Sequence, residues 1–369
     1  MVVLGIVIAG VVLWNAGDLR FQYDFGKLEP HFPKYEEFSK LSGQVSTGTK
    51  RNPAYIIADD DKQVQQLLEV LRQRANIDSL SPTIASIEAL QERFPLSERD
   101  KEDKLEKIKY IRELLADPLL INETSDDFER LRRASQTTTA LTIEQVPDYL
   151  QAQFVSKDGE IGRFVIVYPS VGLSDGKQSI AFKDDVSEIV LPNGITKYAA
   201  STSIVAASML DLMRSESPYM VGATFVIVFL FMLFTFRSIK WSIIAMLPLM
   251  IGLLFLFGIM LLTGFQFNFY NLVVLPAILG IGEDSGVHLA YRYREEGKGR
   301  LPVVLASTGQ HITMGSFTTM LGFAGLLFTA HPGLQSLGIM AVLGIGMTLV
   351  TSLTFLPALL QWLELKGKI

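Results

Sequence analysis

The distribution of apolar residues constrains this chain more than any other feature. Residues 1–14 form a short apolar run, and residues 219–363 are apolar with only brief polar breaks. Residues 18–217, in contrast, are rich in Lys, Glu, Asp and Gln. A water-soluble globular chain does not gather its apolar residues into blocks of this length. The sequence therefore predicts an integral membrane protein with a large polar domain inserted between membrane helices.

The second apolar block divides into five segments. Each is long enough, or nearly so, to cross the roughly 30 Å hydrocarbon core of a bilayer. With the first run they make six predicted spans, at residues 1–14, 219–236, 242–262, 272–291, 312–328 and 334–363. No basic residue precedes the first run. We therefore interpret it as a transmembrane helix shortened at its N-terminal end, with an uncleaved signal anchor as the alternative.

Basic residues alternate between the predicted loops and so predict an orientation. The loops 263–271 and 329–333 contain no Lys or Arg. Within residues 218–369, every Lys and Arg lies in the segments after the second, fourth and sixth spans. These residues are Arg237, Lys240, Arg292, Arg294, Lys298, Arg300, Lys366 and Lys368. The positive-inside rule places basic loops in the cytoplasm. We expect a multi-pass protein of the cell's inner membrane, with residues 18–217 outside the cytoplasm and both termini inside it.

The polar domain alternates strand and helix patterns. Short runs rich in β-branched and aromatic residues predict strands at 53–58, 162–168 and 195–199. Apolar residues at helical spacing predict helices at 61–74, 100–116, 179–190 and 203–215. This order predicts an α/β domain with a helical insertion from about residue 80 to residue 150. The domain organisation expected is a first transmembrane helix in residues 1–17, the polar domain in 18–217 and five membrane helices in 218–369.

Charge and residue counts exclude several functions. The formal net charge is −5, which gives no basic surface for nucleic acid. There is no cysteine, and the four histidines lack a metal-ligand spacing. The polar domain has no glycine-rich phosphate loop, nucleophile elbow or zinc-protease motif. We expect no enzyme activity, catalytic residue, metal or cofactor, and no nucleic-acid partner.

One segment of the fourth predicted span departs from apolarity: residues 280–288 read GIGEDSGVH. A carboxylate in the hydrocarbon core is costly unless it is protonated, paired or hydrated. Such residues therefore face a helix bundle or a cavity, often as part of a proton relay. If the span ended near Gly282, the acids would lie in a loop. Residues 272–282, however, make only about 16 Å of helix, which is too short for a bilayer.

Within this segment we assign Asp284 as the principal proton-relay residue. His288 lies four residues later on the same helix face, where it could shuttle protons or make a structural hydrogen bond. Glu283 points about 100° away from Asp284, and we expect it nearer the interface. Ser285 completes the set of relay candidates. Three glycines would let a neighbouring helix approach closely: Gly280, Gly282 and Gly286.

The first half of the fifth predicted span supplies hydroxyl groups that could serve the acid. Ser316, Thr318 and Thr319 lie close together in it. Such hydroxyls can hydrogen-bond to a carboxylate on another helix. They can equally bond back to the carbonyl groups of their own helix. Both readings stay open at this point.

Residues 280–288 and their surroundings resemble the RND (resistance–nodulation–division) superfamily, in particular its MMPL and hopanoid-transporter branch. Residues 280–288 resemble the pattern Gly-Ile-Gly-x-Asp-(Tyr, Phe, Asp or Asn)-Gly-Ile-His of that branch. They depart from it in two places: Glu283 stands at a usually apolar position, and Ser285 replaces the aromatic or second polar residue. Residues 19–28, 268–271 and 331–338 resemble further conserved segments of the family, in the same order along the chain. The resemblance implies that Asp284 is the proton-relay aspartate. It also implies one repeat of six helices, with an extracytoplasmic porter-type domain that contains ferredoxin-like α/β parts.

The resemblance further implies proton-motive-force-driven export or relocation of a lipid or other hydrophobic molecule. RND transporters of this kind usually have two six-helix repeats, so the partners expected are protons, the substrate, and the other repeat or a second copy of the chain. A C-terminal half is our first interpretation and a natural half-size protein that dimerises is the second. The alternative functions are a lipid-binding sensor similar to sterol-sensing domains, without active transport, and an accessory component of protein translocation.

Overall fold

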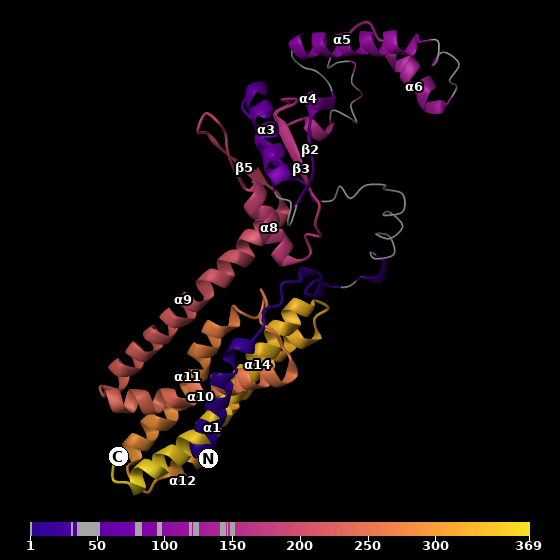
Figure 1. The fold of residues 1–369 in the computed structure, drawn as a ribbon. Helices are drawn as coiled ribbons and strands as arrows, with labels where there is room; N and C mark the ends of the chain where they lie inside the picture. The colour runs from indigo at the N-terminus through magenta and orange to yellow at the C-terminus, as the bar shows by residue number, and fades with distance from the viewer. Residues whose placement is uncertain are drawn as a thin grey trace. The chain divides into compact units, whose positions relative to one another are not determined.

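The computed structural model describes residues 2–30, 32–34, 52–77, 83–93, 98–117, 125–140 and 152–369, together with 120, 145 and 147. Its contacts divide the chain into two compact units (Figure 1). We call Met1–Thr47, Ser174–Gly176 and Met209–Ile369 the membrane unit. Gly48–Leu173 and Lys177–Ser208 form the sheet unit.

The described residues of the sheet unit form a five-stranded sheet in the order β2-β3-β1-β5-β4. Every neighbouring pair is antiparallel. The strands are β1 (Ala54–Ile57), β2 (Ile84–Ala89), β3 (Phe164–Pro169), β4 (Glu188–Val190) and β5 (Thr196–Ala200). Because β3 lies between β1 and β2, and α3 (Asp61–Ile77) connects those two, the unit contains a split β-α-β arrangement of the ferredoxin-like type.

Apolar side chains from one face of the sheet and from two helices form the core of this unit. Ile56 and Val165 of the sheet are fully buried, as are Leu67 of α3 and Phe182 of α8 (Gly176–Val186). All four belong to one cluster of buried residues. The helical spacing in α3 predicts one buried apolar face, and the structure buries that face. Its residues are Val64, Leu67, Leu68 and Leu71.

The three predicted strands are present as β1, β3 and β5, but two other predictions for this unit are wrong. The helix predicted at 179–190 ends at Val186, and Glu188–Val190 instead pairs with β5. The insertion from 80 to 150 is not wholly helical, because β2 occupies its start. The helices described in it are α4 (Leu90–Arg93), α5 (Glu98–Leu115) and α6 (Asp126–Ser135). Residues 78–82, 94–97, 118–119, 121–124, 141–144, 146 and 148–151 of that region lie outside the described residues.

Within the described residues, four helical stretches are long and apolar enough to cross a membrane. They are α9 (Thr202–Phe236), α10 (Ile239–Thr263), the stretch Leu301–Phe328 and α14 (Pro332–Leu365). The stretch Leu301–Phe328 consists of α12 (Leu301–Val304), a π-helical turn, α13 (Gln310–Ala324) and a 3-10 turn. Two further helices of the unit, α1 (Val2–Trp14) and α11 (Val274–Glu296), are not among the four.

Two boundaries of the membrane helices differ from the sequence prediction. The helices expected at 203–215 and 219–236 are one continuous helix, α9, which runs through Pro218. The Ser217 hydroxyl donates to the carbonyl oxygen of Met213 within this turn. The fifth predicted span, 312–328, begins at Leu301 in the structure because the π-helical turn Leu305–Gly309 continues into α13.

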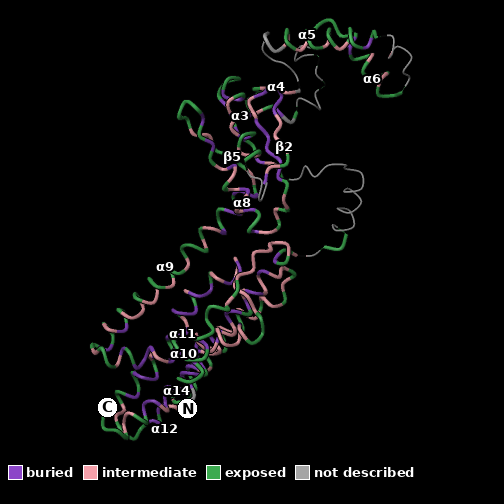
Figure 2. Tube along the Cα trace, viewed as in Figure 1, coloured by how far each residue is buried: buried purple, intermediate pink, exposed green. Residues whose placement is uncertain are grey.

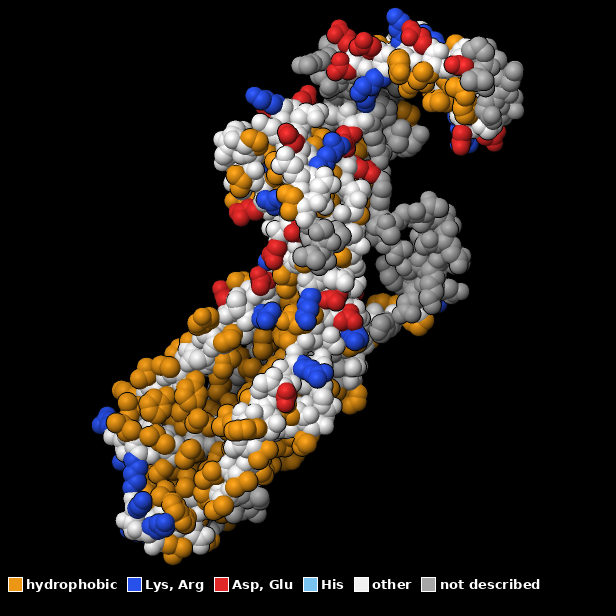
Figure 3. All heavy atoms as spheres, viewed as in Figure 1, with side chains coloured by type: hydrophobic (Ala, Val, Ile, Leu, Met, Phe, Trp, Pro, Cys, Tyr) orange, Lys and Arg blue, Asp and Glu red, His pale blue; other side chains and the backbone are white. Residues whose placement is uncertain are grey.

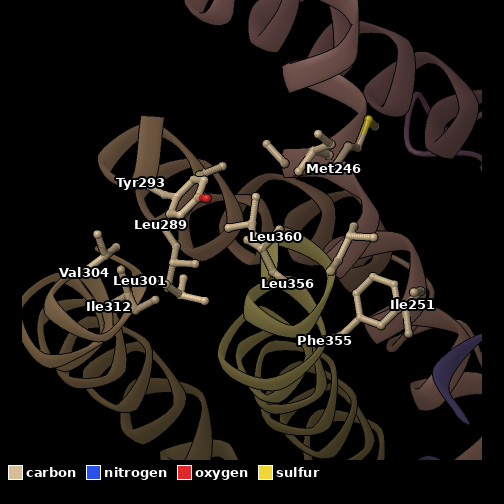
Figure 4. Packing of buried hydrophobic residues seen from close by; sticks show 14 of the residues in the cluster. Met246, Ile251, Leu289, Tyr293, Leu301, Val304, Ile312, Phe355, Leu356 and Leu360 are labelled. Carbon is tan, nitrogen blue, oxygen red and sulfur yellow. The ribbon is translucent and has the colours of Figure 1, made fainter. Parts of the chain in front are cut away.

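Helices α10 and α14 form the centre of the membrane unit. About half of the apolar window of each is buried, 50% and 56%, against 11% for α9 and 6% for Leu301–Phe328. Figure 2 shows the same contrast between the buried central helices and the largely exposed α9. The backbones approach closely at Gly252 of α10, where an added Cβ would lie 2.7 Å from Cα of Thr348. Figure 4 shows Leu289 and Tyr293 of α11 packed beside Leu356 and Leu360 of α14.

Candidate functional site

Two buried asparagines hold the loop that leads into α11. Asn268 Oδ1 accepts hydrogen bonds from the backbone N–H groups of Tyr270 and Asn271, each at 2.9 Å. Asn268 Nδ2 donates to Ser336 Oγ of α14, also at 2.9 Å. An added Cβ at Gly333 would lie 2.3 Å from the Tyr270 ring, so α14 begins directly against this loop. These contacts fix the start of α11 relative to the start of α14.

The Tyr270 side chain joins the same loop to the segment before α14. Its hydroxyl lies 3.3 Å from His331 Nε2, and the two rings meet edge to face. Burial, and after it the charge of Glu29, raises the pKa of Tyr270 above its ordinary value. The phenol therefore stays protonated and able to donate at any physiological pH.

The acidic segment lies in the middle of α11, and its two carboxylates point to different surroundings. Glu283 is 8% exposed and lies on the buried side of the helix. Asp284 is exposed in this chain, and so is His288 one turn later. Among the described residues, no side chain pairs with the Asp284 carboxylate by a hydrogen bond or an ion pair. Glu283 thus faces the helix bundle and Asp284 does not, while the expectation that Glu283 lies nearer the interface stays a prediction.

Asp284 belongs to a row of exposed positions along one face of α11. The row follows the helical repeat of three and four residues, which places its members above one another. We call it the α11 stripe, and its members are Val273, Ala277, Gly280, Asp284, His288 and Tyr291. The stripe thus presents an acid and a histidine between apolar and small residues.

The glycines of the segment have different surroundings. An added Cβ at Gly286 would lie 2.5 Å from the backbone carbonyl oxygen of Ala245 in α10. At Gly282 it would lie 2.8 Å from Thr348 Oγ1 in α14. At Gly280, on the stripe, it would meet nothing within 4 Å. Gly282 therefore allows α11 to approach α14 closely, and Gly286 allows it to approach α10. Gly280 makes no such contact and lies on the exposed face of α11.

One hydroxyl group of α13 contacts another helix, and two bond back to carbonyl groups of α13 itself. Ser285 Oγ of α11 lies 3.3 Å from Ser316 Oγ of α13, which links the two helices. Thr318 and Thr319 instead donate to carbonyl groups of their own helix, at Met314 (2.9 Å) and Gly315 (3.1 Å). None of the three hydroxyls is hydrogen-bonded to Glu283 or Asp284 within the part of the chain that the structure describes.

Sequence reasoning missed a second polar group, on α14. Thr348, Thr351 and Ser352 are at most 1% exposed within an otherwise apolar helix. Thr348 lies against Gly282, next to Glu283 in the chain, and Thr351 Oγ1 lies 2.7 Å from the Pro248 carbonyl oxygen of α10. The Ser352 hydroxyl is buried, with no hydrogen-bond partner among the described residues. The spacing of i, i+3 and i+4 inside an apolar span was the signal that could have identified this group.

The arrangement places two carboxyl groups next to each other on α11, one buried and one exposed. Two adjacent carboxylates repel each other when both are ionised, and the repulsion grows as the surroundings become less polar. The ionisation of one therefore depends on its neighbour and on the water that reaches it. Among the described residues, no group of three or more His, Asp or Glu side chains could hold a metal ion.

Comparison with known proteins identifies the family. The sequence profile of the MMPL family matches residues 56–365, which is most of the chain and includes both units. The chain belongs to the MMPL family. The resemblance to the MMPL branch of the RND superfamily is thereby confirmed, and with it the description as a transmembrane protein of a transporter family.

Three MMPL-related proteins show how the match is distributed. A protein of Methanocaldococcus jannaschii, named only as a membrane protein, is 29% identical over 206 residues, 53% of each chain. The hopanoid transporter HpnN of Rhodopseudomonas palustris is 26% identical over 245 residues, 66% of this chain and 26% of the transporter. The siderophore exporter MmpL5 of Mycobacterium tuberculosis is 26% identical over 201 residues, 51% of this chain and 21% of the exporter. The match thus spans about half of the first relative and about a quarter of the other two.

Proposed function

We propose that this MMPL chain is one half of a proton-driven transporter that exports or relocates a lipid or other hydrophobic molecule. The observation that carries the proposal is the pair Glu283 and Asp284 in the middle of a helix packed into an apolar bundle. A carboxyl group is retained in such surroundings where its protonation is used. The names of two relatives, a hopanoid transporter and a siderophore exporter, support export of hydrophobic substances as the activity.

In the proposed mechanism Asp284 alternates between a protonated and an ionised form. The ionised form requires water or polar partners, whereas the protonated form tolerates apolar contact. Each form therefore favours a different arrangement of the helices around α11, which is what a proton gradient can bias. Glu283, Ser285, His288 and Ser316 are the residues that would exchange the proton or solvate the charge.

The α11 stripe supports a second element of the proposal, namely that another repeat covers it. An exposed carboxylate on a membrane helix is unfavourable against lipid and favourable against a polar partner surface. The partner proposed is the other repeat of a longer transporter or a second copy of this chain. The limited share of each relative that the chain matches supports a repeat of the same protein as that partner.

A single copy of the chain is therefore expected to transport nothing, and purified chain is expected to be active only as a dimer or with the other repeat. Purified chain would be reconstituted into proteoliposomes with a fluorescent phospholipid analogue, and lipid movement followed after an inward proton gradient is imposed. The full-length transporter, with both repeats, should move lipid only while the gradient lasts and stop when a protonophore collapses it. Lipid movement catalysed by monomeric chain alone would contradict the proposed assembly, and movement by the full-length protein without a gradient would contradict proton coupling.

The proposed architecture has six membrane spans, with α1 and α11 added to the four long apolar helices. At about 1.5 Å per residue, the 23 residues of α11 are long enough to cross the bilayer. The sheet unit is proposed as an extracytoplasmic porter-type domain, and both ends of the chain as cytoplasmic. The distribution of Lys and Arg supports this orientation, and Figure 3 shows basic side chains gathered at the end of the apolar helices near the C-terminus.

A pair of lysines tests the orientation, because the chain has no cysteine of its own. Lys62 lies in the sheet unit and Lys298 in the loop after α11, and both are exposed. In intact cells whose outer layers are permeable to the reagent, an impermeant thiol reagent should label Lys62→Cys and leave Lys298→Cys unlabelled until the cells are lysed. The reverse pattern would invert the proposed topology.

A further inference from the structure

A cavity of the membrane unit lies between α1 and the C-terminal end of α10. Its volume is about 780 Å³, within the usual range of small-molecule sites. No residue of the acidic segment lines it. Valine, isoleucine, leucine and methionine side chains form most of its wall, including Val7 and Val11 of α1 and Leu261 of α10.

The polar residues of the cavity are not scattered over the wall. Three of them lie within six residues just after the end of α1: Asn15, Asp18 and Arg20. The fourth, Gln266, lies three residues after the end of α10. All four therefore lie toward one end of the cavity, while the apolar residues of α1 extend away from it. From Val7 to Asn15 the helix rises about 12 Å, slightly less than the roughly 15 Å thickness of one hydrocarbon leaflet.

Backbone hydrogen bonds fix this polar end. The Gln22 N–H donates to the Phe267 carbonyl oxygen at 2.7 Å, and the Phe267 N–H donates to the Arg20 carbonyl oxygen at 3.0 Å. Gly264, with a φ of +70°, turns the chain at the end of α10 so that Phe265 and Gln266 reach the cavity. Arg20 and Gln266 are thus held beside each other on two paired segments, independently of their side chains.

The Arg20 side chain is the most informative member of this end. It is exposed, and no ion pair or hydrogen bond of its guanidinium is found among the described residues. Guanidinium groups bind phosphate through paired N–H donors. Asp18, two residues earlier and also exposed, offers a carboxylate to a cationic group. A polar end with one positive and one negative side chain matches a headgroup that carries both charges.

We propose that this cavity binds one membrane phospholipid with a zwitterionic, amino-bearing headgroup. Its phosphate is bound by Arg20, its ammonium group lies near Asp18, and one acyl chain lies along α1 against Val7 and Val11. Binding at this site does not depend on the titration of Asp284.

The test is a lipid titration of the purified full-length chain, read by native mass spectrometry. Phosphatidylethanolamine, phosphatidylglycerol and diacylglycerol with the same acyl chains would be compared. Phosphatidylethanolamine should bind about tenfold or more tightly than diacylglycerol, the factor expected for a charged hydrogen bond of about 1.5 kcal/mol or more. Arg20→Gln should remove that preference, because it deletes the phosphate ligand and leaves the backbone pairing unchanged.

Two substitutions on α1 locate the lipid. Val11→Trp fills the cavity and should weaken the binding of all three lipids. Leu13→Trp is the matched control, since Leu13 is exposed on the same helix and does not line the cavity. Unchanged binding in Val11→Trp would show that the lipid binds elsewhere.

Two results with the wild-type chain would overturn the proposal. Equal affinity for diacylglycerol and phosphatidylethanolamine would mean that the cavity accepts only hydrocarbon. Tighter binding of phosphatidylglycerol would refute the role given to Asp18. The titration uses no proton gradient, so its outcome is separate from that of the transport experiment.

Discussion

Replacing Asp284 with Asn in a full-length transporter that contains this chain is expected to reduce proton-driven substrate movement to the rate of passive leak. The amide keeps the shape of the carboxyl group but cannot lose or gain a proton near neutral pH. Since the side chain is exposed on the α11 stripe and makes no hydrogen bond or ion pair with the residues that the structure describes, we expect little effect on folding. Substrate movement in proteoliposomes, measured over a range of external pH, provides the test.

Glu283→Gln is the matched comparison for this experiment. It removes the neighbouring carboxyl group, which is buried and faces the bundle rather than the stripe. We expect a smaller loss of rate than with Asp284→Asn, because the proposed relay carboxyl group remains. If Asp284→Asn transports at the wild-type rate with the wild-type pH profile, the relay assignment is wrong. The lipid-sensing alternative would then be the better account of the chain.

Gly286→Ala is expected to destabilise the membrane unit more than any other single-methyl change in the acidic segment. The new Cβ would lie 2.5 Å from the Ala245 carbonyl oxygen, a backbone atom that cannot rotate away. Either α10 or α11 must shift, and overpacking of this kind costs about 1–3 kcal/mol. The melting temperature of the purified chain, followed by circular dichroism, should fall by several degrees.

Gly280→Ala is the control, with the same chemical change about one and two-thirds turns earlier on the same helix. Its Cβ meets nothing within 4 Å, so only the helix propensity changes, which favours Ala over Gly by about 1 kcal/mol. The melting temperature of this variant should stay constant or rise slightly. If both substitutions destabilised the protein equally, the close approach of α10 and α11 would not be the reason why position 286 requires glycine.

The sequence predictions include strands β1, β3 and β5 of the sheet unit but neither β2 nor β4. The helix predicted from Ser179 to Val190 includes the residues that form β4. The structure ends that helix early and uses a turn in which Asn193 Oδ1 accepts from the Ile195 N–H at 3.1 Å and Gly194 has a φ of +80°. The Asn-Gly pair between two apolar runs is a strong hairpin signal, so this strand was predictable from the sequence.

The position of the acids along the membrane helix could be predicted, but their orientation could not. Charge and glycine content are local and identify residues 280–288 from the sequence alone. Which carboxylate faces the bundle depends on how α11 is rotated, and that rotation is set by distant residues such as Ala245 and Thr348. No local pattern contains this information, which is why the buried position of Glu283 was missed.

The central position of α14 has a consequence for the order of events during synthesis. Helix α11 packs against α10 and α14, and α14 is translated after α11. At about 5–20 residues per second, several seconds separate the emergence of Glu283 from the ribosome from that of the helix that encloses it. During that interval the acid lacks the neighbours that α14 supplies and must be protonated, hydrated or in contact with the insertion machinery. A substitution that slows the insertion of α14 would then lower the yield of protein without changing any contact in the finished fold.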